Sequence, residues 1–91
     1  MQLGTSINGF NLGAPEQFSG ANTSKYTTIE GHTFWFSYRT CIAFKPSGGD
    51  LIISQNEWGT TTGKHLNAIN RDKGIRADRE TFEGLLKGFK V

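Results

Sequence analysis

The six residues 60–65, with the sequence TTTGKH, are the densest group in this 91-residue chain that could do chemistry. They lie at the start of a helix that the apolar spacing predicts over about residues 62–70. Free amides at a helix start, beside hydroxyls and a lysine, attract an anion. The phosphate-loop pattern G-x-x-x-x-G-K-[ST] is not matched, because Gly59 lies four residues before Gly63 and a histidine follows the lysine. An anion or nucleotide site and a threonine-capped helix on a solvated face therefore both stay open. The candidate binding residues of this segment are Thr61, Thr62, Lys64 and His65.

No recognisable catalytic set accompanies this segment. The chain has one cysteine, Cys41, and two histidines, His32 and His65. It contains no Gly-x-Ser-x-Gly, nothing in the spacing pairs Cys41 with His65, and the carboxylates are scattered without metal-site spacing. We therefore expect no enzyme activity, no metal and no cofactor, and we interpret Cys41 as a small buried residue of a strand.

Two tryptophans and several polar or basic residues are the other candidates for binding. Strand alternation over 33–38 places Trp35 on the face opposite Phe34 and Phe36, between small polar residues, so we expect its ring to be open to a partner. Trp58 lies between the predicted sheet and helix, where it fits either a core plug or an interface anchor. The remaining candidates are Tyr38, Arg39, Lys45, Asn67 and Arg71.

Elements that position these residues can be predicted from the same pattern. Residues 26–30, 33–38, 41–45 and 51–55 are β-prone and separated by turns, which is typical of an antiparallel meander. A second helix begins after Asp78 and carries an apolar stripe of Phe82, Leu85, Leu86 and Phe89. We predict one α+β domain over residues 26–91, with a three- to four-stranded antiparallel sheet followed by two short helices packed on one face. Residues 1–25 are predicted to form an irregular N-terminal arm that packs over the sheet or orders in an oligomer.

Composition and charge limit the kinds of partner but do not identify one. A net charge of +2 permits contact with nucleic acid or an acidic protein face and does not demand either. The sequence has no membrane-length apolar run and no signal-peptide pattern, and its single cysteine fits a reducing compartment. We therefore expect a cytoplasmic protein without a membrane partner, and a homodimer is a further alternative.

Two stretches of the chain resemble an uncharacterised family of small proteins from bacteriophages, archaeal viruses and prokaryotic mobile elements. The first is Ser37-Tyr38-Arg39-Thr40-Cys41-Ile42-Ala43-Phe44, and the second runs from Asn56 to Ile69 with the sequence NEWGTTTGKHLNAI. The family pattern has Ser where this chain has Gly59. The resemblance covers about residues 33–70 and implies a viral or mobile-element context, in the cytoplasm of a host cell.

Three functions follow as expectations. The first is a phage-type binding protein that stoichiometrically inhibits a host defence system, similar to an anti-CRISPR protein, by acting on a host protein or ribonucleoprotein. The second is a nucleic-acid-binding accessory or regulatory protein that contacts DNA or RNA. The third is a nucleotide- or anion-binding protein that uses the helix start at residues 60–65.

Overall fold

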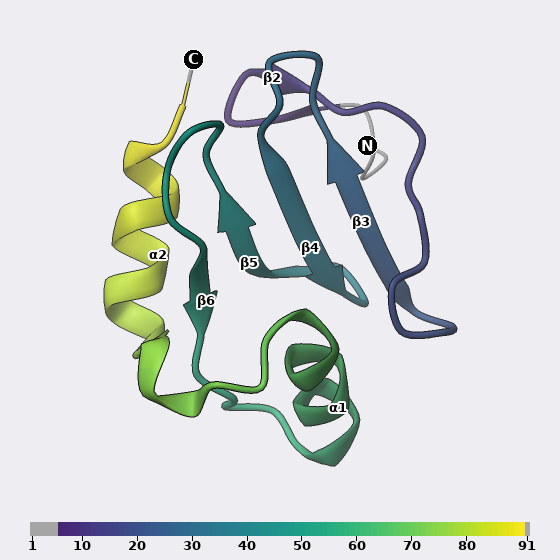
Figure 1. Ribbon diagram of the computed structural model, residues 1–91, viewed down its shortest axis with the longest axis vertical. Helices are drawn as coiled ribbons and strands as arrows, with labels where there is room; N and C mark the ends of the chain where they lie inside the picture. The colour runs from purple at the N-terminus through teal and green to yellow at the C-terminus, as the bar shows by residue number, and fades with distance from the viewer. Residues whose placement is uncertain (1–5, 91) are drawn as a thin grey trace.

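A five-stranded sheet with the strand order β3-β4-β5-β6-β7 is the centre of the computed structural model, which describes residues 6–90 (Figure 1). The first four strands form an antiparallel meander, as predicted, whereas β7 pairs in parallel with β6 at the edge. The strands are β3 (Thr23–Thr27), β4 (Thr33–Ser37), β5 (Thr40–Lys45), β6 (Ile52–Ser54) and β7 (Arg76–Ala77). The predicted three to four strands were too few, because the two residues of β7 are too short to show any periodicity.

Alternation along the strands gives the sheet two apolar faces. In β4, Phe34 and Phe36 contribute to one buried cluster, while Trp35 packs against a second cluster on the opposite face. The register between β4 and β5 shifts after Trp35. Trp35 pairs with Ala43, whereas the next residue, Phe36, pairs with Cys41. Both faces of this sheet therefore require a cover.

The two helices cover opposite faces, which corrects the prediction that both pack on one face. In α1 (Thr60–Ile69), Leu66 packs in the cluster that holds Ile53, whereas in α2 (Arg79–Gly88), Phe82 packs in the cluster that holds Phe34. A helix that joins two parallel neighbouring strands must cross one face of the sheet, and α1 does this between β6 and β7. The chain then passes a short 3-10 turn, η1 (Lys73–Ile75), and β7 before α2 returns along β6 on the other face (Figure 1).

Residues 6–25, expected as an irregular arm, contain a small hairpin and part of the core. The hairpin pairs β1 (Ser6–Ile7) with β2 (Phe10–Asn11). Phe10 is buried against the aromatic cluster, and the Asn8 side-chain amide donates to the carbonyls of Leu86 and Phe89, at 2.7 and 2.9 Å. The boundary predicted at residue 25 falls inside β3, and residues 1–5 of the expected arm lie outside the described part of the chain.

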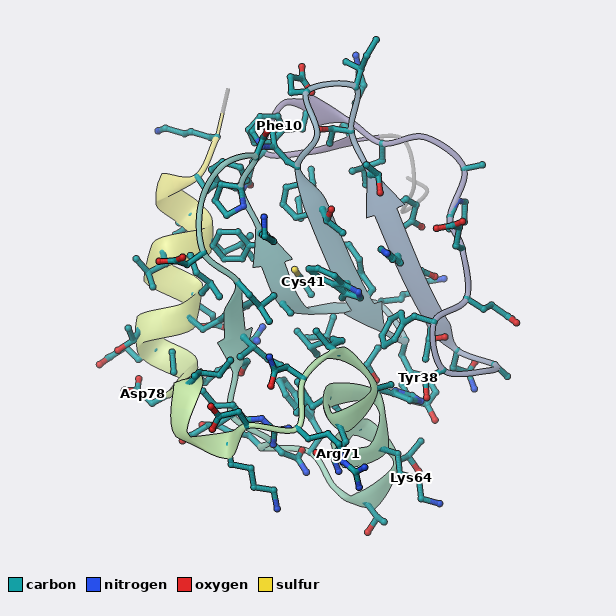
Figure 2. The ribbon with its side chains drawn as sticks, viewed as in Figure 1. Phe10, Tyr38, Cys41, Lys64, Arg71 and Asp78 are labelled. Carbon is teal, nitrogen blue, oxygen red and sulfur yellow. The ribbon has the colours of Figure 1, made fainter. Side chains whose placement is uncertain are left out.

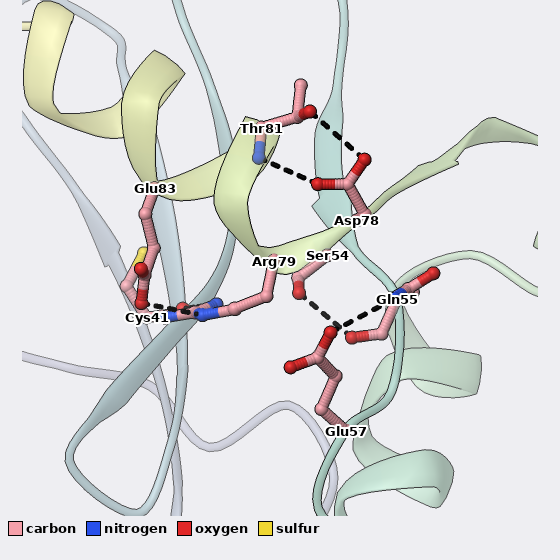
Figure 3. Close-up of polar contacts among 8 residues, drawn as sticks. All are labelled: Cys41, Ser54, Gln55, Glu57, Asp78, Arg79, Thr81 and Glu83. Carbon is pink, nitrogen blue, oxygen red and sulfur yellow. Dashed lines mark hydrogen bonds and ion pairs between the residues drawn. The ribbon is translucent and has the colours of Figure 1, made fainter.

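The face under α2 is built from aromatic rings and is closed by a capped helix. Phe44 stacks on Phe89, with ring centroids 5.3 Å apart, and meets the fully buried Phe82 edge-on at 5.6 Å. Such pairs contribute about 0.5–1.5 kcal/mol beyond their buried area. Asp78 caps α2 as predicted, because its carboxylate accepts from the backbone amide of Thr81 at 2.9 Å (Figure 3).

The apolar stripe predicted for α2 is only partly buried. Phe82, Leu86 and Phe89 face the sheet, while Leu85 is exposed. Neither helix described within residues 6–90 is long and apolar enough to cross a membrane.

Candidate functional site

The start of α1 is held by an asparagine side chain and not by a threonine. Gly59 is the N-cap and makes no side-chain cap bond. The Asn56 side chain accepts from the amides of Trp58 and Gly59, at 3.0 and 3.3 Å, and donates to the Gly59 carbonyl at 2.9 Å. A Cβ on Gly63 would lie 3.0 Å from this amide nitrogen, which is closer than an ordinary contact, so a side chain at this position would push the Asn56 amide away from α1. The predicted threonine cap was therefore wrong.

A buried polar network joins α1 to the end of β4. The Ser37 hydroxyl lies 2.7 Å from Nδ1 of His65 and 3.1 Å from the Thr62 hydroxyl, and all three residues are buried. The Phe18 ring lies against the imidazole edge-on, with centroids 6.4 Å apart. Burial disfavours the charged ring and lowers the pKa of His65 below 6.5. The network therefore ties α1 to the sheet with an imidazole that stays neutral at physiological pH.

Tyr38 directly follows this network and has an unusual backbone. It is the first residue of the two-residue connection between Ser37 and Thr40, and its φ is +56°. Glycine is the usual choice where such a connection requires a positive φ at this position. The amide of Tyr38 donates to the Asn22 carbonyl at 2.7 Å, and 54% of the residue is exposed. The fold therefore displays an aromatic ring at a position where the backbone favours a residue without a side chain.

Trp58 is also exposed, and the guanidinium of an arginine lies against its ring. The guanidinium of Arg79 lies 5.0 Å from the Trp58 ring and 4.9 Å from the ring of Phe82. The same guanidinium donates to the Cys41 carbonyl at 3.1 Å and pairs with Glu83 at 3.0 Å (Figure 3). Trp58 is 44% exposed, so it is neither a core plug nor a free ring.

These residues surround a small pocket of about 230 Å³, which we call the Tyr38–Trp58 pocket. Its walls combine two aromatic rings, one aliphatic side chain and three hydroxyls. The lining residues are Ser37, Tyr38, Thr40, Ile42, Trp58 and Thr62. The pocket is large enough for one apolar side chain of a partner and has hydroxyls at its wall to fix a polar group.

The structure brings three predicted site residues together in this pocket, Tyr38, Trp58 and Thr62, and a fourth, His65, contacts the pocket residue Ser37. Sequence reasoning missed Ser37, Thr40 and Ile42 as site residues. The signal for Ser37 was present, because it opens the first segment of the family resemblance. Its hydrogen bond to a helix 28 residues further along cannot be inferred from local spacing.

The other predicted site residues lie outside this pocket. Trp35 is partly buried under α1, with Lys25 Nζ 5.8 Å from its ring, so it does not stand open on the sheet as expected. Lys64 lies on α1 and Arg71 follows two residues after its end, and both are exposed (Figure 2). Exposed side chains also include Arg39, Lys45, Thr61 and Asn67.

Cys41 is the buried strand residue that the sequence predicted. Burial raises the pKa of its thiol from 9.0 to about 12, and a backbone hydrogen bond with Ala43 and the Arg79 charge offset this only in part. A neutral thiol is a poor nucleophile and a poor metal ligand. No group of three or more metal-ligating side chains of the His, Cys, Asp or Glu type occurs within residues 6–90.

Fold and site together define a small α+β domain with an aromatic, hydroxyl-lined pocket at the junction of β4, β5 and α1. The chain belongs to a family of unknown function, DUF8033, whose model matches residues 11–84. The matched region spans β2 to most of α2 and contains the whole pocket. No curated protein and no solved structure matches the chain.

Proposed function

We propose that the protein is a non-enzymatic binding module that uses the Tyr38–Trp58 pocket to hold a partner protein. The observation that carries this proposal is the display of two large aromatic rings, 54% and 44% exposed, on either side of one pocket. Tyrosine and tryptophan dominate binding hot spots, because they bury large area and lose little side-chain freedom.

Backbone strain at Tyr38 supports the same conclusion. A residue with a side chain in the left-handed region costs about 1–3 kcal/mol, and such strain concentrates at functional sites. The ring has one ring contact among the described residues, with the His65 imidazole at 6.2 Å between centroids, and more than half of the residue stays exposed. Its retention is explained if a partner buries the ring.

The charges around the pocket indicate which partner surface fits. Arg39 is exposed beside Tyr38, and Lys64 is exposed on α1, two residues after the pocket-lining Thr62. The one ion pair within residues 6–90 joins Arg79 and Glu83, so neither of these two cations is paired with a carboxylate. A partner with an apolar side chain surrounded by acidic residues or phosphates complements this face.

The specific role that we propose is stoichiometric inhibition of a host defence system, similar to an anti-CRISPR protein, inside the host cytoplasm. Its support is the resemblance to phage and mobile-element proteins, together with the binding face. Occupation of a protein or ribonucleoprotein surface requires no catalytic group from the inhibitor.

A capture experiment tests the proposal. Tagged wild-type protein and the double variant Tyr38→Ser, Trp58→Ser are used to capture partners from lysate of a prokaryotic host. Ile29→Ser is the matched control, because Ile29 is 96% exposed and lies outside the pocket lining. The expected result is a stoichiometric partner that is retained by the control and lost by the double variant. Equal capture by all three proteins contradicts the proposed face.

Nucleic-acid binding is the second candidate, and two exposed cations favour it. Lys64 on α1 and Arg71 just after its end have no carboxylate partner among the described residues (Figure 2). Fluorescence anisotropy with labelled DNA and RNA tests this role. If phosphates dominate, affinity falls steeply with salt and falls further in the variant Lys64→Gln, Arg71→Gln. Salt-independent binding or no binding removes it.

A further inference from the structure

A second pocket, of about 300 Å³, lies against a different side of α1 from the Tyr38–Trp58 pocket. Its lining contains two cations and three side-chain amides, without a carboxylate. These residues are Gln55, Asn56, Gly63, Asn67, Lys73 and Arg76, and we call the space they enclose the Arg76 pocket. The volume lies at the small end of the range for sites that hold small molecules.

Arg76 is the residue that gives this pocket its chemistry. Its Nη2 donates to Oδ1 of Asn67 at 2.9 Å and to the Asn70 carbonyl at 3.2 Å, so the guanidinium is fixed between β7 and α1. Its Nε is buried and has no hydrogen-bond partner among the described residues. A buried donor without an acceptor is rare and costs about 1–3 kcal/mol. The other terminal nitrogen, Nη1, is not buried and makes no hydrogen bond among the described residues, so this fixed guanidinium can receive an oxygen of an anion in the pocket.

The backbone keeps this pocket open. Gly63 and Asn67 are four residues apart and therefore lie on one stripe of α1, away from the buried stripe of Thr62, His65 and Leu66. A side chain at position 63 would meet the Asn56 amide, as described above, and would narrow the pocket. Glycine at this position therefore serves both the 56–59 loop and the open wall.

Charge balance selects the kind of anion. Lys73 and Arg76 together place two positive charges on the lining. The nearest carboxylates along the chain, Glu57 and Asp72, do not line the pocket and form no ion pair with either cation: Glu57 accepts from the Gln55 amide at 3.0 Å, and Asp72 accepts from the Gly74 backbone amide at 2.9 Å. A carboxylate ligand would balance only one of the two cations, whereas a phosphate monoester, close to −2 at neutral pH, balances both.

We propose that the Arg76 pocket binds a terminal phosphate attached to a nucleoside. The guanidinium and Lys73 hold the phosphate. The side-chain oxygen of Gln55 and the side-chain nitrogen of Asn67 make no hydrogen bond among the described residues, so they offer one acceptor and one donor to the edge of a base. The same chemistry is found in a free nucleoside 5′-monophosphate and in the 5′-phosphorylated end of an oligonucleotide. This site is independent of the Tyr38–Trp58 pocket, and it replaces the start of α1 as the place for the expected nucleotide.

Nuclear magnetic resonance titration of the full chain tests the site directly. The Nε–H group of Arg76 has its own ¹H–¹⁵N signal, and we expect it and the Gly63 amide to shift as adenosine 5′-monophosphate is added. Adenosine without phosphate should produce no shift up to millimolar concentration, and inorganic phosphate should bind about tenfold more weakly than the nucleotide, since it lacks the base contacts. Shifts confined to other residues, or equal affinity for inorganic phosphate and nucleotide, overturn the proposal.

The two sources of the phosphate are separated by a 5′-phosphorylated dinucleotide. If it binds at least as tightly as the mononucleotide, the site takes a strand end, and if it fails to bind, the site takes the free nucleotide. Both outcomes support the pocket, because both require the Arg76 signal to shift with the ligand that binds.

Matched lysine variants show whether the charge acts locally. Lys73→Gln removes a charge from the pocket lining, and Lys64→Gln removes the same charge from α1 outside it. Both lysines are exposed, so neither variant should unfold the domain. We expect Lys73→Gln to weaken nucleotide binding by roughly three- to fivefold and Lys64→Gln by less than roughly twofold. Equal weakening by both would show general attraction to a positive surface and would contradict the site.

Discussion

The two faces of the sheet are built by different means. Within residues 6–90, the α2 face has eight buried apolar residues, and six of them are aromatic. These six are Phe10, Tyr26, Phe34, Phe36, Phe44 and Phe82. The α1 face has four buried apolar residues, plus a polar network and a helix without a side-chain cap. Both pockets that we assign to ligands lie on the α1 side.

This difference indicates that the α2 face stabilises the domain, whereas the α1 side binds ligands or partners. Aromatic burial under α2 supplies most of the apolar area that stabilises the domain, at roughly 25 cal/mol per Å². The α1 side instead has exposed rings, a strained backbone at Tyr38 and an unsatisfied guanidinium at Arg76. Such features reduce the stability of the folded chain and are typical of surfaces that bind a ligand or partner.

The largest expected effect is on the α2 face. Phe82 is fully buried, so Phe82→Ala should lower the free energy of unfolding by about 3–5 kcal/mol, through lost burial and the cavity left behind. Leu85→Ala in the same helix is the control and should change it by less than about 0.5 kcal/mol, because Leu85 is exposed. Urea denaturation measures both. Similar effects of the two substitutions would show that the aromatic cluster does not dominate stability.

A smaller effect is expected where the polar network joins α1 to the sheet. Ser37→Ala removes the partner of His65 Nδ1 and of the Thr62 hydroxyl, and both groups remain buried. The free energy of unfolding should fall by about 1–3 kcal/mol. Thr40→Ala, at the cross-strand partner of Ser37, tests whether loss of any hydroxyl from the pocket wall has this effect. An equal loss for Thr40→Ala would contradict a special role of the network.

The pH dependence of stability tests the role of His65 on the α1 side of the sheet. Because the pKa of His65 is lowered in the folded chain, the unfolded chain binds the proton first as the pH falls. The contribution of the neutral ring is therefore fully present above pH 6.5 and is lost progressively below it. Urea midpoints at pH 7.5 and 5.5 should differ more for the wild-type protein than for His65→Asn. An unchanged difference in the variant would show that His65 is not the group responsible.

Much of the sheet could be predicted from the sequence, because alternation along 33–38, 41–45 and 51–55 is a local pattern. The hairpin of β1 and β2 and the two-residue β7 could not, since their pairing depends on contacts with distant segments. The placement of α1 and α2 on opposite faces was missed for the same reason. This placement follows from the parallel pairing of β6 and β7, which no local sequence pattern predicts.

The candidate site was predictable only in part. Tyr38, Trp58, Thr62 and His65 stood out as polar or aromatic residues that a core does not need. The fold places the first three around one pocket and His65 against the pocket residue Ser37. The Arg76 pocket was not predicted, because its lining comes from the end of β6, the middle of α1 and the η1–β7 segment. Only the folded chain brings those three segments together.

Tyr38→Gly tests the central claim most directly, because it separates stability from binding. Glycine relieves the backbone at φ +56° and removes only a ring that is more than half exposed. The account predicts a variant with an unchanged or higher melting temperature that no longer captures the partner retained by the wild-type protein. A variant that unfolds more readily, or that binds the partner as well as the wild type does, would contradict the conclusion that Tyr38 is kept for binding.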